Sequence, residues 1–60
     1  MDPSILNIAE TVKSACIEAA RDGFRDASMS GLCTEGAMEA AISAIQKLNV
    51  EEIVKKQPEA

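Results

Sequence analysis

The seven residues SGLCTEG at positions 30–36 constrain the fold of this chain more than any other feature. They separate two segments whose apolar residues recur at helical spacing. Gly31 suits the left-handed residue that ends a helix, and Leu32 suits the hydrophobic contact that often accompanies such an end. Because the connection is only two or three residues long, we expect the flanking helices to pack as an antiparallel hairpin.

The second half of this corner contains the signals that begin a helix. Thr34, or alternatively Cys33, is expected to cap the second helix, and Glu35 in its first turn complements the helix dipole. Gly36 weakens that first turn. A glycine at this position is explained if the backbone here approaches another chain closely.

The first helix is predicted over about 3–29. Asp2 can cap it and Pro3 suits its first position, where a missing N–H costs nothing. Gly23 could end this helix or lie within it, and we favour a continuous helix in which Gly23 permits close approach of the facing helix. The predicted inner stripe consists of Ile5, Ile8, Ala9, Val12, Ala15, Cys16, Ala19, Ala20, Gly23 and Ala27, whereas Thr11, Ser14, Glu18, Arg21 and Asp22 lie opposite.

A second row of larger residues lies about 110° round the first helix from the centre of that stripe. It consists of Leu6, Ile17 and Phe24, and Ile42 lies off the inner face of the second helix in the same way. One hairpin buries one stripe of each helix, so a separate bulky row predicts a second neighbour. The alternative is that this row is only the border of one wide stripe.

The second helix is predicted over about 35–48 and a short third helix over about 50–56. Asn49 is the expected cap of the third helix, with Glu52 as its capping-box partner and Leu48 packing on Ile53. Residues 57–60 are expected to be a frayed tail. The predicted inner face of the second helix consists of Ala37, Met38, Ala41, Ala44, Ile45 and Leu48.

Sixty residues form at most one domain, and a chain of this length buries only about 60% of its unfolded surface. We therefore expect the fold to need further stabilisation by disulfides, a metal or oligomerisation. Two cysteines and no histidine argue against a disulfide framework and against a zinc site. The alanine-rich inner faces bury little area, so we predict a homodimeric four-helix-like bundle with Leu6, Ile17, Phe24 and Ile42 at the association seam.

The net charge of −4 argues against nucleic-acid binding, because that affinity comes largely from Lys and Arg. No apolar run approaches the ~20 residues that span a bilayer, so no membrane anchor or signal peptide is predicted, and a cytoplasmic location is expected. The pairs expected on the helix surfaces are Glu18 with Arg21, Asp22 with Arg25, Glu51 with Lys55 and Glu52 with Lys56.

Cys33 is the only residue with an argument for reactivity. A thiol just before a helix feels the positive end of the dipole, but Glu35 opposes the thiolate and the chain contains no histidine to act as a base. Cys16 belongs to the inner stripe and is expected to be a buried small residue. The N–H groups at the start of the second helix could receive an anion, as every helix start can.

The run GLCTEGAMEAA at 31–41, preceded by RDASMS at 25–30, resembles the corner of small uncharacterised bacterial helical-hairpin proteins of similar length. Thr34 stands where a histidine is often found in them. The resemblance implies a bacterial, stand-alone hairpin, and it implies no activity, cofactor or site residue.

These observations predict a small non-catalytic interaction protein without cofactors, which self-associates and binds a protein partner. The alternative is a thiol- or anion-responsive sensor centred on Cys33. An obligate subunit that folds only with a larger enzyme is a third interpretation.

Overall fold

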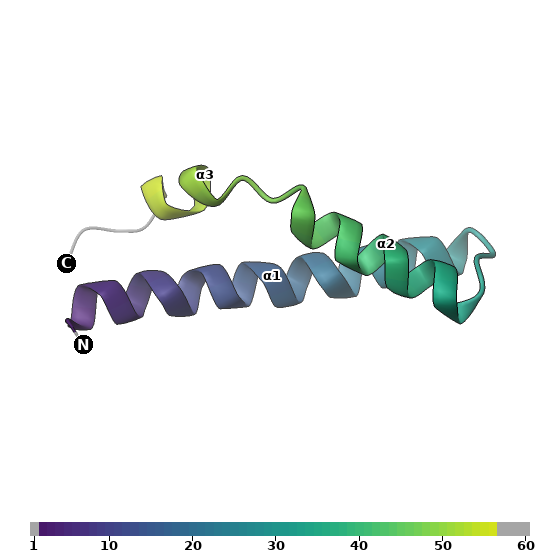
Figure 1. The fold of residues 1–60 in the computed structure, drawn as a ribbon, viewed down its shortest axis with the longest axis horizontal. Coiled ribbons are helices and arrows are strands. Elements are labelled where there is room, and N and C mark those ends of the chain that lie inside the picture. Colours follow the sequence, from purple (N-terminus) through teal and green to yellow (C-terminus); the bar gives the residue numbers. More distant parts are fainter. Residues whose placement is uncertain (1, 57–60) are drawn as a thin grey trace.

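The computed structural model describes residues 2–56, which form three α-helices: α1 (Pro3–Met29), α2 (Thr34–Gln46) and α3 (Val50–Lys55). The helix α2 runs back along the second half of α1, as the predicted hairpin requires (Figure 1). The all-helical fold is thus confirmed for the described part of the chain. The tail expected at 57–60 lies outside it.

The start and the continuity of α1 follow the prediction. The Asp2 carboxylate accepts a hydrogen bond of 2.8 Å from the Ser4 backbone N–H, and Pro3 occupies the first helical position. The helix then continues without a break through Gly23 to Met29. At about 1.5 Å per residue, its 27 residues reach roughly twice as far as the 13 of α2.

The corner ends α1 with the expected left-handed glycine. Gly31 has a φ of +95°, the only positive φ in the described residues. The Leu32 N–H donates to the Ala27 carbonyl at 3.0 Å, and the Gly31 N–H donates to the Ser28 carbonyl at 3.1 Å. These two bonds form a Schellman motif, which satisfies carbonyls that the helix leaves unpaired.

The cap of α2 differs from the expected one. Cys33, not Thr34, is the N-cap residue, with an extended backbone and no capping hydrogen bond from its side chain. Thr34 is already the first helical residue. Because the Schellman motif ends at Leu32, the chain has only one residue left to turn into α2, and that residue is Cys33.

The second connection also begins earlier than expected. The helix α2 ends at Gln46, so Leu48 lies between helices and not within one. The Asn49 side chain accepts a hydrogen bond of 3.1 Å from the Glu52 N–H, which confirms it as the cap of α3. Its extended backbone, with ψ of 94°, is incompatible with continuing α2. The Glu51–Lys55 ion pair forms at 3.5 Å, whereas Glu52 and Lys56 form none.

The helices α1 and α2 pack through their smallest residues. A Cβ placed on Gly23 would lie 2.9 Å from the Ala40 carbonyl oxygen and 3.0 Å from the Ala44 Cβ. The backbones therefore approach so closely that only glycine fits. Ala37 is completely buried and Ala27 nearly so.

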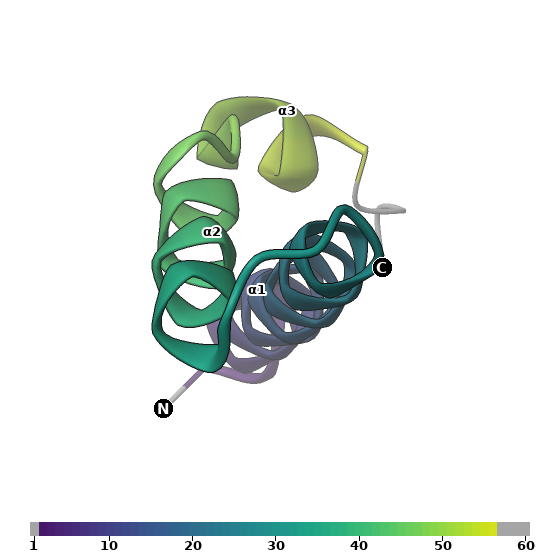
Figure 2. The same cartoon turned by 90° about the vertical axis from the view of Figure 1, so that its right-hand side faces the viewer.

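The short helix α3 packs on the first half of α1 and makes no contact with α2. Viewed along α1, the helices α2 and α3 lie in two different directions from it (Figure 2). This placement explains why Thr11, expected on the outer side of α1, is half-buried together with Ile8 and Ala15. Ile5 and Ala9, expected inside, are exposed.

The orientation of α2 is the largest departure from the predicted faces. Met38 and Ile45 were expected inside but are exposed, while Ala40 is half-buried against Gly23. Close approach at Gly23 requires the small-residue side of α2, and the bulkier side chains must then turn outward. The residues that form the half-buried or buried side of α2 are Gly36, Ala37, Ala40, Ala41, Ser43 and Ala44.

Candidate functional site: an open apolar face

Most of the large apolar side chains lie at the surface of a single chain. Within residues 2–56 the buried apolar residues are two alanines, and no large side chain is fully buried. The chain exposes 4762 Å², whereas a compact monomer of 6.4 kDa exposes roughly 3,800 Å².

The row predicted on α1 is exposed as a unit. Leu6, Ile17 and Phe24 are 48%, 47% and 38% exposed. At about 100° per residue they lie within about 20° of one another around the helix axis. Exposed fractions of this size fit both a separate seam and the border of one wide stripe, so the association seam stays a prediction.

A second exposed row lies on α2. Met38, Ile42 and Ile45 follow one another at four and three residues and are all exposed. Ile42, the predicted seam residue, lies farther round α2 from the buried alanines than the other two. Sequence reasoning missed Met38 and Ile45 as surface residues, and the close spacing of small residues around Ala40 is the signal that could have revealed them.

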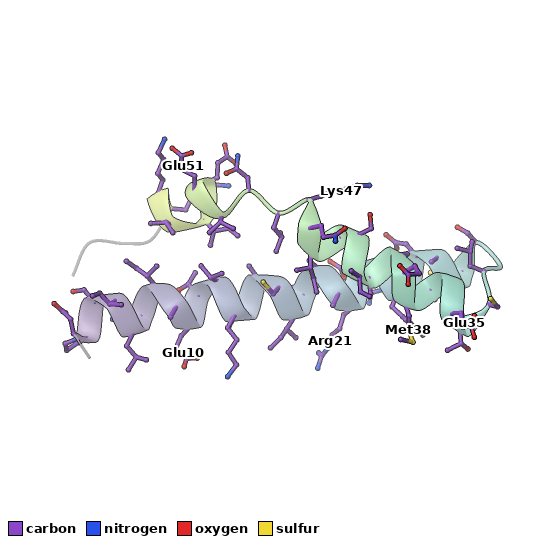
Figure 3. The ribbon with its side chains drawn as sticks, viewed as in Figure 1. Glu10, Arg21, Glu35, Met38, Lys47 and Glu51 are labelled. Carbon is purple, nitrogen blue, oxygen red and sulfur yellow. The ribbon has the colours of Figure 1, made fainter. Side chains whose placement is uncertain are left out.

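Both rows lie on the side of the hairpin away from α3. Figure 3 shows Glu10, Arg21 and Met38 pointing away from α3, whereas Lys47 and Glu51 lie on its side. Leu6 is one turn from Glu10, and Arg21 lies between Ile17 and Phe24, so the α1 row shares this direction. We call the resulting surface the open face; it consists of Leu6, Ile17, Phe24, Met38 and Ile45, with Ile42 at its edge.

Two side chains of opposite charge flank the open face at different positions along α1. Glu10 lies toward the beginning of the helix and Arg21 toward its end. Among the described residues neither of them forms an ion pair, and the expected Glu18–Arg21 pair is absent. The Asp22–Arg25 pair does form, on the solvent-exposed surface of α1. Both charges beside the open face are therefore available to a partner.

The two thiols differ in their exposure, and Cys16 is less buried than expected. Cys33 is exposed at the N-cap of α2, and Cys16 is half-buried on the inner side of α1. Gly36, the other unexplained residue of the corner, is approached by its own chain: a Cβ there would lie 3.2 Å from the Leu32 Cδ2. The atoms nearest to Gly36 thus belong to the flexible Leu32 side chain of the same chain.

Two classes of site find no support in the part of the chain that the structure describes. No group of three or more Cys, Asp or Glu residues within 2–56 is arranged to hold a metal ion. None of the described helices is long and apolar enough to cross a membrane.

Comparison with protein-family models, with curated proteins and with solved structures gives no match to this chain. The resemblance to small bacterial helical-hairpin proteins therefore stays a prediction. The open face is the feature from which a function can be argued.

Proposed function

We propose that this protein is a small non-catalytic interaction protein that self-associates through the open face and binds a protein partner. The observation that carries the proposal is the location of the large apolar side chains. In residues 2–56 alanine forms the buried core, while Leu6, Ile17, Phe24 and Met38 face solvent. Large contiguous apolar surface patches mark interaction sites.

Self-association would also supply stability that a single chain lacks. A 60-residue chain with a core of small residues gains little from its own burial, at about 25 cal/mol per Å². Two hairpins that join their open faces would form the predicted homodimeric four-helix-like bundle. The acidic surface that remains, with a net charge of −4 per chain, is compatible with a basic protein partner.

Sedimentation equilibrium over micromolar concentrations tests the proposal. We expect the wild-type chain to be a dimer. The variant Ile17→Glu should raise the dissociation constant of the dimer about tenfold or more, because it places a charge in the centre of the open face. Met29→Glu is the matched control, since Met29 is 79% exposed but lies outside the open face. A wild-type chain that is well folded and strictly monomeric contradicts the proposal.

The alternative of a sensor centred on Cys33 is supported by the exposure of the thiol beside the first N–H groups of α2. Its test is alkylation with iodoacetamide across a range of pH. Reaction of Cys33 at the rate of an ordinary free thiol contradicts the sensor. The cytoplasmic location and the absence of catalysis remain expectations from the sequence.

A further inference from the structure

The charges beside the open face indicate how two copies would be aligned. We propose that the occupant of the open face is a second copy whose α1 runs antiparallel, with Leu6 of each chain against Phe24 of the other and Glu10 paired with Arg21 across the interface. This inference rests on the proposed self-association and adds its direction and register.

The direction follows from the positions of the charges. Glu10 and Arg21 lie on the same side of α1 as Met38 and are separated by 11 residues, or about 16 Å along the helix. Parallel helices would place Glu10 beside Glu10 and Arg21 beside Arg21, where like charges repel. An antiparallel two-fold arrangement centred near residue 15 instead brings each Glu10 to an Arg21, twice per dimer.

The register follows from the apolar row. With the same centre, Leu6 of one chain lies opposite Phe24 of the other, and Ile17 lies beside the alkyl stem of Lys13. Lys13 is exposed and forms no ion pair among the described residues, so its ammonium group can stay in solvent while its stem packs. One alignment thus satisfies both the apolar row and the charges.

The small side chain of Ala20 is consistent with this alignment. Ala20 lies between Ile17 and Phe24 on the side of α1 that borders the row, and it is only half-buried by its own chain. Its small side chain lets a second copy approach closely along this edge of the row, which is the edge nearer to α2. Met38 on α2 lies on the same side of the hairpin and extends the apolar surface available to Leu6.

Disulfide trapping in the full chain tests the alignment. The background is Cys16→Ala with Cys33→Ser, into which Leu6→Cys or Phe24→Cys is introduced. After mixing and mild oxidation, we expect the mixed Leu6→Cys and Phe24→Cys dimer to form quickly. Leu6→Cys alone should not cross-link, because its two copies would lie about 27 Å apart along the helices.

Charge reversal provides the second measurement. Glu10→Arg alone and Arg21→Glu alone should each raise the dimer dissociation constant roughly tenfold at low salt, and the double variant should restore it. Glu18→Arg is the matched control, because Glu18 lies on α1 away from the open face and forms no ion pair among the described residues.

The outcomes separate this inference from the proposed function. A dimer in which Leu6→Cys cross-links with itself, or in which Leu6→Cys does not cross-link with Phe24→Cys, overturns the alignment and leaves self-association standing. A monomer overturns both proposals. If the chain is a folded monomer that sediments with neutral phosphatidylcholine vesicles, the open face is assigned to a lipid surface. If the monomer is instead unfolded, the chain is an obligate subunit of a larger assembly.

Discussion

The two halves of α1 are covered in opposite ways. The second half packs on α2 through glycine and alanine, with backbones so close that a Cβ at Gly23 would meet the Ala40 carbonyl at 2.9 Å. The first half carries larger residues such as Ile8 and Val12, yet only the six-residue α3 covers it. Small residues thus produce the closest packing, and the larger ones are left partly exposed.

This difference shows that apolar size and helix contact are separate properties in a short hairpin. Tight contact between backbones gains many dispersion contacts per helix turn, but it requires the bulkier residues to lie elsewhere. In this chain they form the open face and the loosely covered end of α1. The halves should therefore respond differently to substitution.

Gly23→Val should have the largest effect, because it disrupts the close packing of the second half of α1 on α2. The added side chain meets backbone and not a flexible side chain, so α1 and α2 must separate. We expect the free energy of unfolding to fall by about 3 kcal/mol, measured by urea denaturation at fixed protein concentration. Ser14→Val on the exposed side of α1 is the control for β-branching, and equal effects of the two variants would contradict the close-approach argument.

Gly31→Ala should have the next largest effect, because it strains the corner that joins the halves. A Cβ at Gly31 meets nothing within 4 Å, so the cost comes only from the left-handed backbone at φ +95°. We expect a loss of about 1–2 kcal/mol in the same denaturation experiment. Gly31→Asn should lose less, since asparagine tolerates this conformation better, and a larger loss for Asn would argue against a purely backbone cost.

Asn49→Ala should weaken only α3 and the first half of α1, which α3 covers. It removes the cap of α3, which is worth about 1 kcal/mol at a helix N-terminus. Amide hydrogen exchange should accelerate in the first half of α1 and in α3, while the amides around Gly23 keep their protection. Asn49→Asp preserves the cap and should leave the exchange pattern unchanged. Uniform acceleration along α1 would show that the two halves are one cooperative unit.

Gly36→Ala should have the smallest effect, and it tests whether the contact with Leu32 at the corner opposes a larger side chain. Alanine gains up to about 1 kcal/mol of helix propensity, but its Cβ would displace the Leu32 side chain, which is half-exposed and can move. We expect a net stabilisation of about 0.5 kcal/mol or less. In a Leu32→Ala background the same change should gain more, and an unchanged gain would mean that Leu32 does not oppose it.

The sequence predicted the helices and most of their ends, because those depend on local chemistry. Asp2, Gly31 and Asn49 act through bonds to residues within five positions, so their roles can be read without the rest of the chain. Cys33 as the cap of α2 was the less favoured alternative. It follows from the length of the Schellman motif, which leaves Cys33 as the single residue between Leu32 and the first residue of α2, Thr34.

The faces of α2 could not be predicted from hydrophobicity. A stripe drawn through the most apolar residues contains Met38 and Ile45, whereas contact with Gly23 selects Ala40 and Ala44. That choice depends on how closely two distant segments approach, and the closely spaced small residues around Ala40 are the only local sign of it. The seam predicted at Leu6, Ile17 and Phe24 is exposed in the single chain, and its burial between two copies remains a prediction.

The placement of α3 on the first half of α1 has a consequence for the order in which the molecule assembles. The contacts around Gly23 close a short loop through the corner, while those of α3 join segments about forty residues apart, at a higher entropic cost. We expect the corner end to form first and the contact between α3 and the first half of α1 to form last. During that interval the beginning of α1 has no cover from its own chain, and a second copy could reach it before α3 does.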